Sequence, residues 1–454
     1  MSCLTRSIAQ SDAFLQELIE KISTAPSLAL LILAALQLGR AVAVKVAEEV
    51  LNERGQAPDA GLPCPKCGKN LESKGLKPRE MMTLIGWVKW WRRVRSCPGE
   101  CAIGQVVPSD EALGLRPYQQ TSVEVTWLAC ALAVFVPFET AAALLGLLTG
   151  VKVCSKSIWG WVQAVGQRAM AQLNTQLEAL AQGELPTEEA MTAPTQALPL
   201  LIGSDGVMVP FRPAAGRAKG KTVWREVKVG VLARLGERVT QAGKRVTYLT
   251  QRRLVAVLGD IDALSPRLWL EAVRQGIRGS QRVVWLSDGG RGFWRLFEER
   301  FAQYAIGILD FYHAAQNLWK GSKAWLDGRT QRARAWFSSA RRRLRRGQAS
   351  EVLADLEAAL ALEGLPVSAR QTLTNLYNYL DKHQEHLDYA KFKELGLPIG
   401  SGLVESACKW LVQQRFKGVG MRWSEDGFNH LLHLRLAWVN GRFDNLFALA
   451  APPN

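Results

Sequence analysis

The chain has 454 residues, of which 48% are hydrophobic and 22% charged, so it has the composition of an ordinary globular protein and needs no special stabilising device. Its length is too great for one domain and predicts about three. The net charge of +16 favours a polyanionic partner. Because the basic residues lie mostly outside the apolar segments, nucleic acid is favoured over a lipid surface.

Residues 1–58 are expected to form a helical N-terminal region, because apolar residues recur at helical spacing in Phe14–Ile22 and Leu28–Leu51. Acidic residues precede any apolar run, so no signal peptide is expected. Two apolar runs invite comparison with membrane spans, but Leu28–Leu38 is too short to cross a bilayer, and Trp127–Leu148 is interrupted by a proline and a glutamate. Both runs are interpreted as core helices, with no membrane partner.

Residues 59–108 are predicted to form a zinc ribbon. The motifs Cys64-Pro-Lys-Cys67 and Cys97-Pro-Gly-Glu-Cys101 have the spacing of a tetrahedral four-cysteine site, which would hold one structural Zn²⁺. The alternative is four cysteines without a ligand. The intervening stretch alternates apolar and basic residues around a glycine, as a β-ribbon does. Its basic side chains suit phosphate contact: Lys89, Arg92, Arg93 and Arg95.

Residues 109–182 are predicted to contain a helix-turn-helix, because Phe138–Gly150 and Ser155–Gln167 read as two apolar-faced helices joined by a short turn. A plain helical bundle is the alternative. The second helix would present DNA-contacting side chains: Lys156, Ser157 and Gln163. Residues 183–199 contain three prolines and no apolar period, and are expected to be a linker.

From residue 200 the pattern becomes α/β. Strands are expected at Leu200–Pro210, Trp224–Leu235, Leu254–Gly259, Arg282–Ser287 and Tyr304–Leu309, and helices at Ser265–Gln275 and Gly292–Phe301. Three strands followed by helix, strand, helix and strand is the order of an RNase H-like sheet. Residues 200–314 are therefore predicted to be the first part of an RNase H-like domain, 315–395 an all-helical insertion, and 396–454 the C-terminal part of the domain.

Three carboxylates stand in settings that suit metal chemistry. Asp205 and Asp288 each follow a predicted buried strand and are followed by glycine, and Glu405 is predicted to open a helix after a glycine-rich turn. A single Asp-Gly at a strand end is usually only a turn. Right-handed crossovers place the strands of Asp205 and Asp288 side by side, however, and carboxylates gathered in this way bind two Mg²⁺ or Mn²⁺ ions.

Further residues are expected near this cleft. Asp310 and His313 follow the next strand and are predicted to orient the metal ligands, although a helix cap is an equal alternative for the histidine. The insertion carries a run of arginines that is either a solvated helix face or a phosphate contact, with three positions singled out for DNA: Arg341, Arg342 and Arg345.

The ordered set of Asp205-Gly, Ser287-Asp-Gly, Leu309-Asp-Phe-Tyr-His313 and Gly400-Ser-Gly-Leu-Val-Glu405 resembles the bacterial insertion-sequence DDE transposases. It is closest to the Kra-type elements, which are similar to Mutator-like transposases. The resemblance covers roughly residues 60–445 and implies that Asp205, Asp288 and Glu405 are the catalytic acids.

By this resemblance the substrate is double-stranded DNA, both the element's terminal inverted repeats and the target. A homodimer or higher oligomer in a synaptic complex and a cytoplasmic, nucleoid-associated location in a bacterium are also implied. Two other functions remain open: an RNase H-like nuclease without strand transfer, and a zinc-ribbon DNA-binding regulator without catalysis.

Overall fold

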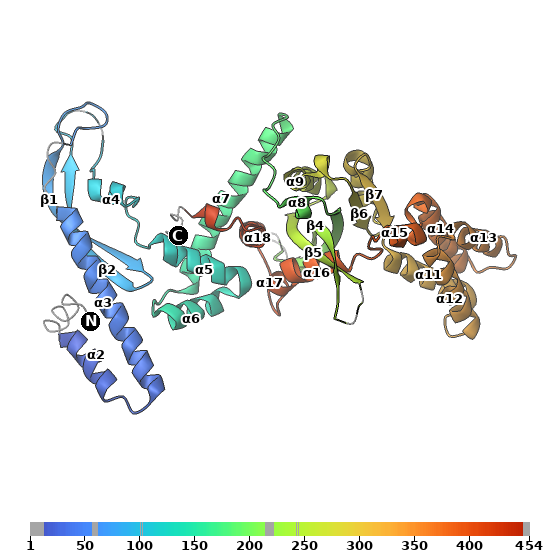
Figure 1. The fold of residues 1–454 in the computed structure, drawn as a ribbon, viewed down its shortest axis with the longest axis horizontal. Helices are drawn as coiled ribbons and strands as arrows, with labels where there is room; N and C mark the ends of the chain where they lie inside the picture. Colours follow the sequence, from blue (N-terminus) through green and yellow to red (C-terminus); the bar gives the residue numbers. More distant parts are fainter. Residues whose placement is uncertain are drawn as a thin grey trace. The chain divides into compact units, whose positions relative to one another are not determined.

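The computed structural model describes residues 13–56, 62–99, 101, 103–213, 222–241, 243 and 245–447. It contains two compact units (Figure 1). The first comprises the chain up to Val162 together with Phe447, and the second spans Gln163–Leu446. The boundary falls inside helix α7 (Ser155–Ala181), which therefore contributes residues to both units.

The first unit begins with α2 (Ala13–Ser23) and α3 (Leu28–Gln56), followed by an antiparallel ribbon of β1 (Glu72–Thr83) and β2 (Gly86–Ser96). Helix α3 packs along the ribbon (Figure 1), where Val44, Ala47 and Leu51 cover the buried Met81, Val88 and Trp90. The side chains of Glu48 and Asn52 accept hydrogen bonds from the backbone N–H groups of Lys89 and Trp91, at 3.0 and 2.8 Å. The N-terminal helix and the ribbon thus form one packed body.

Helix α3 differs from the sequence expectation in both length and burial. The run Leu28–Leu38 is only its first part, because the helix continues without a break to Gln56. Among the described helices, α3 alone is long and apolar enough to cross a membrane by length and composition, with a mean hydropathy of 1.8 in its most apolar window. Its first half is not a core helix, since Leu28 is 74% exposed and Leu33 57%.

Three further helices complete the described part of the first unit: α4 (Pro108–Ala112), α5 (Val123–Phe135) and α6 (Phe138–Thr149). The apolar run Trp127–Leu148 is broken where predicted, at Pro137, which separates α5 from α6. Gly150 ends α6 in the left-handed conformation, with φ at 75°, which a residue bearing a Cβ adopts only with strain. Helix α7 follows after a short turn, so the predicted pair of helices is present.

The second unit is built on a five-stranded sheet in the order β5-β4-β3-β6-β7. Its strands are β3 (Leu200–Phe211), β4 (Val223–Val239), β5 (Arg245–Leu258), β6 (Val283–Ser287) and β7 (Ala305–Leu309). The first three strands pair antiparallel, while β6 and β7 run parallel to β3. The sheet is therefore mixed, with β3 at its centre.

Helices α8 (Ala193–Gln196), α9 (Ile261–Arg274) and α10 (Arg291–Leu296) lie in the chain before and between these strands, and α10 continues as a π-helical turn over Phe297–Phe301. The core beneath them is aromatic, because the buried Trp285 of β6 stacks on Phe301 with ring centroids 5.1 Å apart. Helix α9 begins four residues before its expected start. Asp260 caps it by accepting from the N–H of Ala263, and Pro266 is tolerated inside it.

After β7 the chain is helical. The elements are α11 (Phe311–Leu326), α12 (Gln331–Arg345), α13 (Ala349–Leu360), α14 (Val367–Lys382), α15 (Tyr389–Glu394), α16 (Gly402–Ala407), the π-helical Cys408–Gln413, α17 (Gln414–Phe416) and α18 (Glu425–Val439). No strand occurs between β7 and α16 in this fully described stretch, as the sequence predicts.

The stretch expected as a linker, residues 183–199, is fastened to the second unit by ion pairs. The carboxylate of Glu189 pairs with the guanidinium groups of Arg253 and Arg442 and accepts a hydrogen bond from Gln275. The fully buried Arg234 of β4 donates to the carbonyl oxygen of Leu198 at 2.9 Å. This segment is consequently an integral part of the unit.

Candidate functional site

Two of the three predicted acids stand on adjacent strands at the same level. In the parallel pairing of β3 with β6, Ser204 is opposite Ser287. The next residues are Asp205, still within β3, and Asp288, directly after the end of β6. Strand β6 ends at Ser287, as expected. Asp205 does not end its strand, because β3 continues to Phe211 through pairing with β4. It lies instead at the level where its parallel neighbour ends.

Helix α16 brings the third acid to the same place. Its Val404 packs on β3 so closely that a Cβ built on Gly203 would lie 2.4 Å from a methyl carbon of Val404. The adjacent residue is Glu405, in the first turn of the helix. The pKa of Asp205 is raised, first by burial and then by the negative charges of Asp288 and Glu405. The three carboxylates therefore share one electrostatic environment.

This acidic group has no lysine or arginine as a counterpart. Among the described residues, no lysine or arginine lies within ion-pair distance of Asp205, Asp288 or Glu405. One oxygen of Asp205 accepts from the N–H of Gly206 at 2.7 Å, and one oxygen of Asp288 from the N–H of Gly290 at 3.0 Å. Two half-buried aspartates beside the exposed Glu405, with no lysine or arginine within ion-pair distance, fit a divalent ion such as Mg²⁺.

The carboxylates are less tightly gathered than the cysteines described below. In the described part of the chain, the cysteine group is the one whose ligand atoms all lie within 4.8 Å of one another.

Both carboxylate oxygens of Asp310 are used in hydrogen bonds to the backbone. Its side chain is buried, and one oxygen accepts from the N–H groups of Tyr312 and His313, which caps α11. The other oxygen accepts from the N–H of Ser401 at 2.5 Å. Burial opposes ionisation, but these bonds, together with the His313 side chain, lower the pKa of Asp310 to about 2. Asp310 thus connects the end of β7 to the turn that precedes Glu405.

His313 faces the acidic group from α11. Its Nδ1 lies 3.6 Å from a carboxylate oxygen of Asp310, and its side chain is about one third exposed. The pKa of His313 is raised by Asp310 in the first place and further by the charges of Asp288 and Asp205, against the effect of burial. The histidine is therefore placed to contact a ligand bound beside these carboxylates.

Sequence reasoning missed several neighbours of Asp288 and Asp205. The indole N–H of Trp294 donates to the backbone oxygen of Asp288 at 2.7 Å. The ring of Tyr379, from α14, covers Gly289, where an added Cβ would meet a ring carbon at 1.9 Å. The thiol of Cys408 lies 4.0 Å from a carboxylate oxygen of Asp205. Of these contacts, only the one between Tyr379 and Gly289 has a local sign in the sequence, because a glycine permits a ring to approach the backbone closely.

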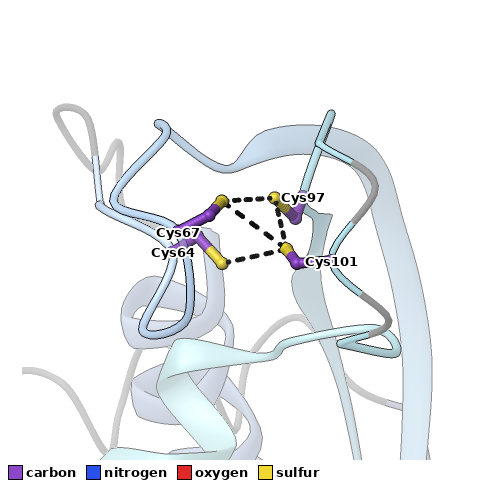
Figure 2. A group of neighbouring side chains, drawn as sticks. All are labelled: Cys64, Cys67, Cys97 and Cys101. Carbon is purple, nitrogen blue, oxygen red and sulfur yellow. Dashed lines mark hydrogen bonds between the residues drawn. The ribbon is translucent and has the colours of Figure 1, made fainter.

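The four cysteines of the first unit converge as predicted (Figure 2). The sulfur of Cys101 lies 3.0 Å from that of Cys97 and 3.5 Å from those of Cys64 and Cys67, and the sulfurs point toward one another. Backbone N–H groups of Lys66 and Gly99 approach the sulfurs of Cys64 and Cys97 at 3.4 and 3.3 Å. This group of four thiols suits one tetrahedral zinc ion, which prefers thiolate ligands at about 2.3 Å.

The basic residues of the ribbon are less available than expected. Lys89 is exposed, 3.1 Å from Glu80. The guanidinium of Arg92, however, lies 2.9 Å from the buried carboxylate of Asp110. Arg93 donates to Ser73 at 3.2 Å, and the buried Arg95 donates to a backbone carbonyl. The expectation of an exposed basic row therefore fails for Arg92 and Arg95, whose charge is used inside the first unit.

The other residues predicted to contact DNA differ in how exposed they are. On α7, Lys156 is exposed and Ser157 partly exposed, whereas Gln163 is bonded to His430 at 2.6 Å and does not face solvent freely. On α12, the predicted arginines are all exposed: Arg341, Arg342 and Arg345. The guanidinium groups of Arg341 and Arg345 lie 5.7 and 5.9 Å from the centre of the Phe311 ring.

No family model matches the chain. A Streptococcus gallolyticus protein described as "UPF0236 protein in vanSb 3′ region" is 26% identical over 391 residues, which cover 83% of this chain and 76% of that protein. Among solved structures, the Drosophila P element transposase strand transfer complex matches with 11% identity and a TM-score of 0.25, covering 73% of this chain and 81% of that one. A TM-score of 0.25 is too low to establish a shared fold. The chain is thus similar in sequence to a UPF0236 protein over most of its length.

Proposed function

We propose that the chain is a DDE transposase whose second unit is an RNase H-like catalytic domain with a helical insertion. The observation that carries the proposal is the placement of Asp205 and Asp288 at one level of two adjacent parallel strands, with Glu405 on a helix packed against the first strand. The strand order supports it, because three antiparallel strands followed by two parallel ones is the RNase H-like arrangement. The ordered acid motifs of the sequence point the same way.

In this proposal Asp205, Asp288 and Glu405 hold two Mg²⁺ or Mn²⁺ ions. Bound there, the ions would activate the attacking oxygen and stabilise the leaving 3′ oxygen of a phosphodiester. The chain's own residues fix the ligands: the hydrogen bonds of Gly206 and Gly290 orient the two aspartates, and Asp310 holds the turn before Glu405. His313, with its raised pKa, donates a hydrogen bond to a phosphate oxygen in the cleft.

The first unit supplies DNA recognition in this proposal. The four cysteines bind one structural Zn²⁺ that leaves no open coordination position, so no chemistry occurs there. Lys89 and Arg93 on the ribbon and Lys156 and Ser157 on α7 contact the element ends. Arg341, Arg342 and Arg345 contact the DNA backbone beside the cut, without reading its sequence. Two or more copies assemble on the two ends.

Substitution of the acids tests the proposal. Asp205→Asn, Asp288→Asn and Glu405→Gln are each expected to reduce Mg²⁺-dependent nicking of supercoiled DNA to background, because the amide keeps the size of the side chain but loses the charge that holds the ion. Thermal unfolding and DNA affinity should change little. The matched control is Glu363→Gln, which removes an exposed charge from the loop between α13 and α14.

The outcomes separate the competing functions. A residue whose variant cuts at the wild-type rate is not a metal ligand. Wild-type nicking together with joining of a free 3′-hydroxyl end to target DNA supports a transposase, whereas nicking without joining identifies a nuclease. DNA binding without nicking in Mg²⁺ or Mn²⁺ identifies a regulator.

A further inference from the structure

A groove of about 540 Å³ runs between α11 and α12 of the insertion, outside the acidic group. It combines aromatic rings with arginine side chains, and the residues that define it are Tyr312, Gln316, Trp319, Arg334, Phe337 and Arg341. The proposed function assigns a role only to Arg341, as a backbone contact, and leaves the aromatic lining unexplained.

The sequence places this lining by helical periodicity. On α11, Tyr312 and Trp319 are seven residues apart, or about two turns, and therefore lie on one face. On α12, Arg334 and Arg341 have the same separation. The two helices pack together, so an aromatic row and a basic row border the same groove.

The rings are held in place but remain open to the groove. Trp319 packs edge-on against Phe337, with ring centroids 5.2 Å apart. Tyr312 is 56% exposed although its ring rests on the backbone of Gly400, where an added Cβ would lie 2.5 Å from it. An exposed ring fixed by its neighbours loses little conformational entropy when a flat group stacks on it.

The charge of the groove specifies what can bind. Helix α12 contains six arginines and no acidic residue, and Arg334 and Arg341 are both exposed. An anionic ligand with flat apolar groups matches both rows, and unpaired DNA has this chemistry. Phosphates would meet the arginines while bases stack on the rings. An intact duplex offers phosphates but keeps its bases stacked inside, so it leaves the aromatic row unused.

Tyr312 connects the groove to the segments that carry the acidic group. Tyr312 lies between Asp310 and His313 in sequence, and its ring contacts Gly400, in the turn that leads to Glu405. A strand that passes Tyr312 would therefore come near the segments that carry the three carboxylates.

We infer that this groove binds unpaired nucleotides of the DNA strand next to the cleavage site, an inference that rests on the proposed function and extends it to a distorted substrate. Tyr312 and Trp319 stack on bases, and Arg334 and Arg341 contact phosphates. The aromatic contact makes the enzyme prefer a locally opened strand over a closed duplex.

Binding of two fluorescent DNA probes by the full-length chain tests the inference. One probe is a blunt duplex, and the other has the same sequence with a short unpaired 3′ arm that carries 2-aminopurine. The protein carries Asp205→Asn so that no probe is cut. Tyr312→Leu should weaken binding of the forked probe roughly 5- to 100-fold, the range for loss of one stacked base, and leave binding of the duplex unchanged. Stacking of 2-aminopurine on an aromatic ring is expected to quench its fluorescence. Tyr312→Phe keeps the ring, so this variant should bind the forked probe as the wild type does and quench the fluorescence equally.

Charge controls use the same helix. Arg341→Gln should weaken binding of the forked probe more than Arg332→Gln, which removes an equal charge from an exposed position outside the groove. Tyr312 is exposed, so its variants should unfold at the wild-type temperature. Equal losses on both probes, or a 2-aminopurine signal unaffected by Tyr312→Leu, overturn the inference.

The test separates this inference from the proposed function. If the wild-type chain nicks DNA but Tyr312→Leu leaves the preference for the fork unchanged, the groove assignment is wrong and the catalytic proposal stands. If Tyr312→Leu removes the preference while the wild-type chain cuts no DNA with Mg²⁺, the groove assignment stands and the catalytic proposal fails.

Discussion

Asp310 shows how one side chain can support the proposed metal site through backbone hydrogen bonds. Its two oxygens accept three backbone N–H groups, from Tyr312, His313 and Ser401. Asp310→Ala should lower the free energy of unfolding by about 2 kcal/mol or more, since it removes a helix cap and leaves buried donors without a partner. Cleavage should fall partially, because the turn before Glu405 loses its anchor. Urea denaturation and a nicking assay on the same preparation measure the two effects.

Asp310→Asn retains one acceptor oxygen and should lie between the wild type and Asp310→Ala in both measurements. Complete loss of cleavage by Asp310→Asn with unchanged stability, together with normal cleavage by Asp288→Asn, would instead make Asp310 the second metal ligand.

The ionisation of Glu189 is expected to make the free energy of unfolding depend on pH. Burial opposes its ionisation, but Arg253, Arg442 and Gln275 lower the pKa of Glu189 from 4.5 to about 2 in the folded chain. A carboxyl group whose pKa is lower in the folded than in the unfolded chain stabilises the folded state fully at any pH above its unfolded pKa. This contribution is lost as the pH falls from about 4.5 toward 2. Denaturation between pH 7 and pH 3 should show a steeper loss for the wild type than for Glu189→Gln.

The difference between these two proteins at pH 7 should be about 1–2 kcal/mol, because the ion pairs of Glu189 are partly open to water and are screened. Parallel stability curves for the wild type and Glu189→Gln over this pH range would contradict the assignment.

At the scale of elements, the contact between β3 and α16 positions Glu405. Gly203→Ala places a methyl group 2.4 Å from Val404, with the backbone oxygen of Leu286 only 3.1 Å away, so the helix must shift. Such overpacking typically costs about 1–3 kcal/mol. We expect reduced cleavage along with this loss of stability. The double variant Gly203→Ala with Val404→Ala should recover much of both, since it removes the clash.

Gly279→Ala is the matched control, because a Cβ at that position meets no atom within 4 Å. Equal effects of Gly203→Ala and Gly279→Ala would mean that a methyl group at Gly203 does not displace α16.

The elements themselves were largely predictable. The strands β3, β6 and β7 are short runs of aliphatic residues, and their expected ends differ from the observed ones by one residue. Strand β5 was predicted too short, because its first half, Arg245–Arg253, is mostly polar and lacks the apolar signal. It forms a strand all the same because it pairs with the end of β4. Tertiary pairing overrides local composition there.

The candidate site was predictable only in part. The cysteines were found because their spacing is local, and Asp205 and Asp288 because each follows an aliphatic run next to glycine. The environment of Arg92 depends on Asp110, and that of Gln163 on His430, both distant in sequence. The contact of Tyr379 with Gly289 arises from how the insertion folds back on the sheet. Such long-range contacts leave no trace in a single sequence.

At the scale of the whole molecule, the two units should respond separately to loss of metal. Removal of zinc with a chelator is expected to unfold the region around residues 62–106, because only part of its apolar side chains is buried and the metal supplies much of its folding free energy. The sheet and insertion of the second unit should remain folded. Elemental analysis should find about one zinc per chain, and limited proteolysis after chelation should cut the ribbon first.

Cys64→Ser should reproduce the effect of the chelator, while Cys154→Ser, an exposed cysteine outside the group, should not. A zinc content near zero, with an unchanged proteolysis pattern for Cys64→Ser, would rule out the site.

The hydrogen bonds from β2 to Glu48 and Asn52 also bear on solubility. A protein expressed from residue 62 onward would keep all four cysteines, yet the backbone N–H groups of Lys89 and Trp91 would lose their acceptors, and the apolar side chains Met81, Val88 and Trp90 would lose their cover. An exposed edge strand of this kind can pair with a strand of another chain and so cause aggregation. The helix that sequence composition assigns to a separate region therefore protects the ribbon from self-association.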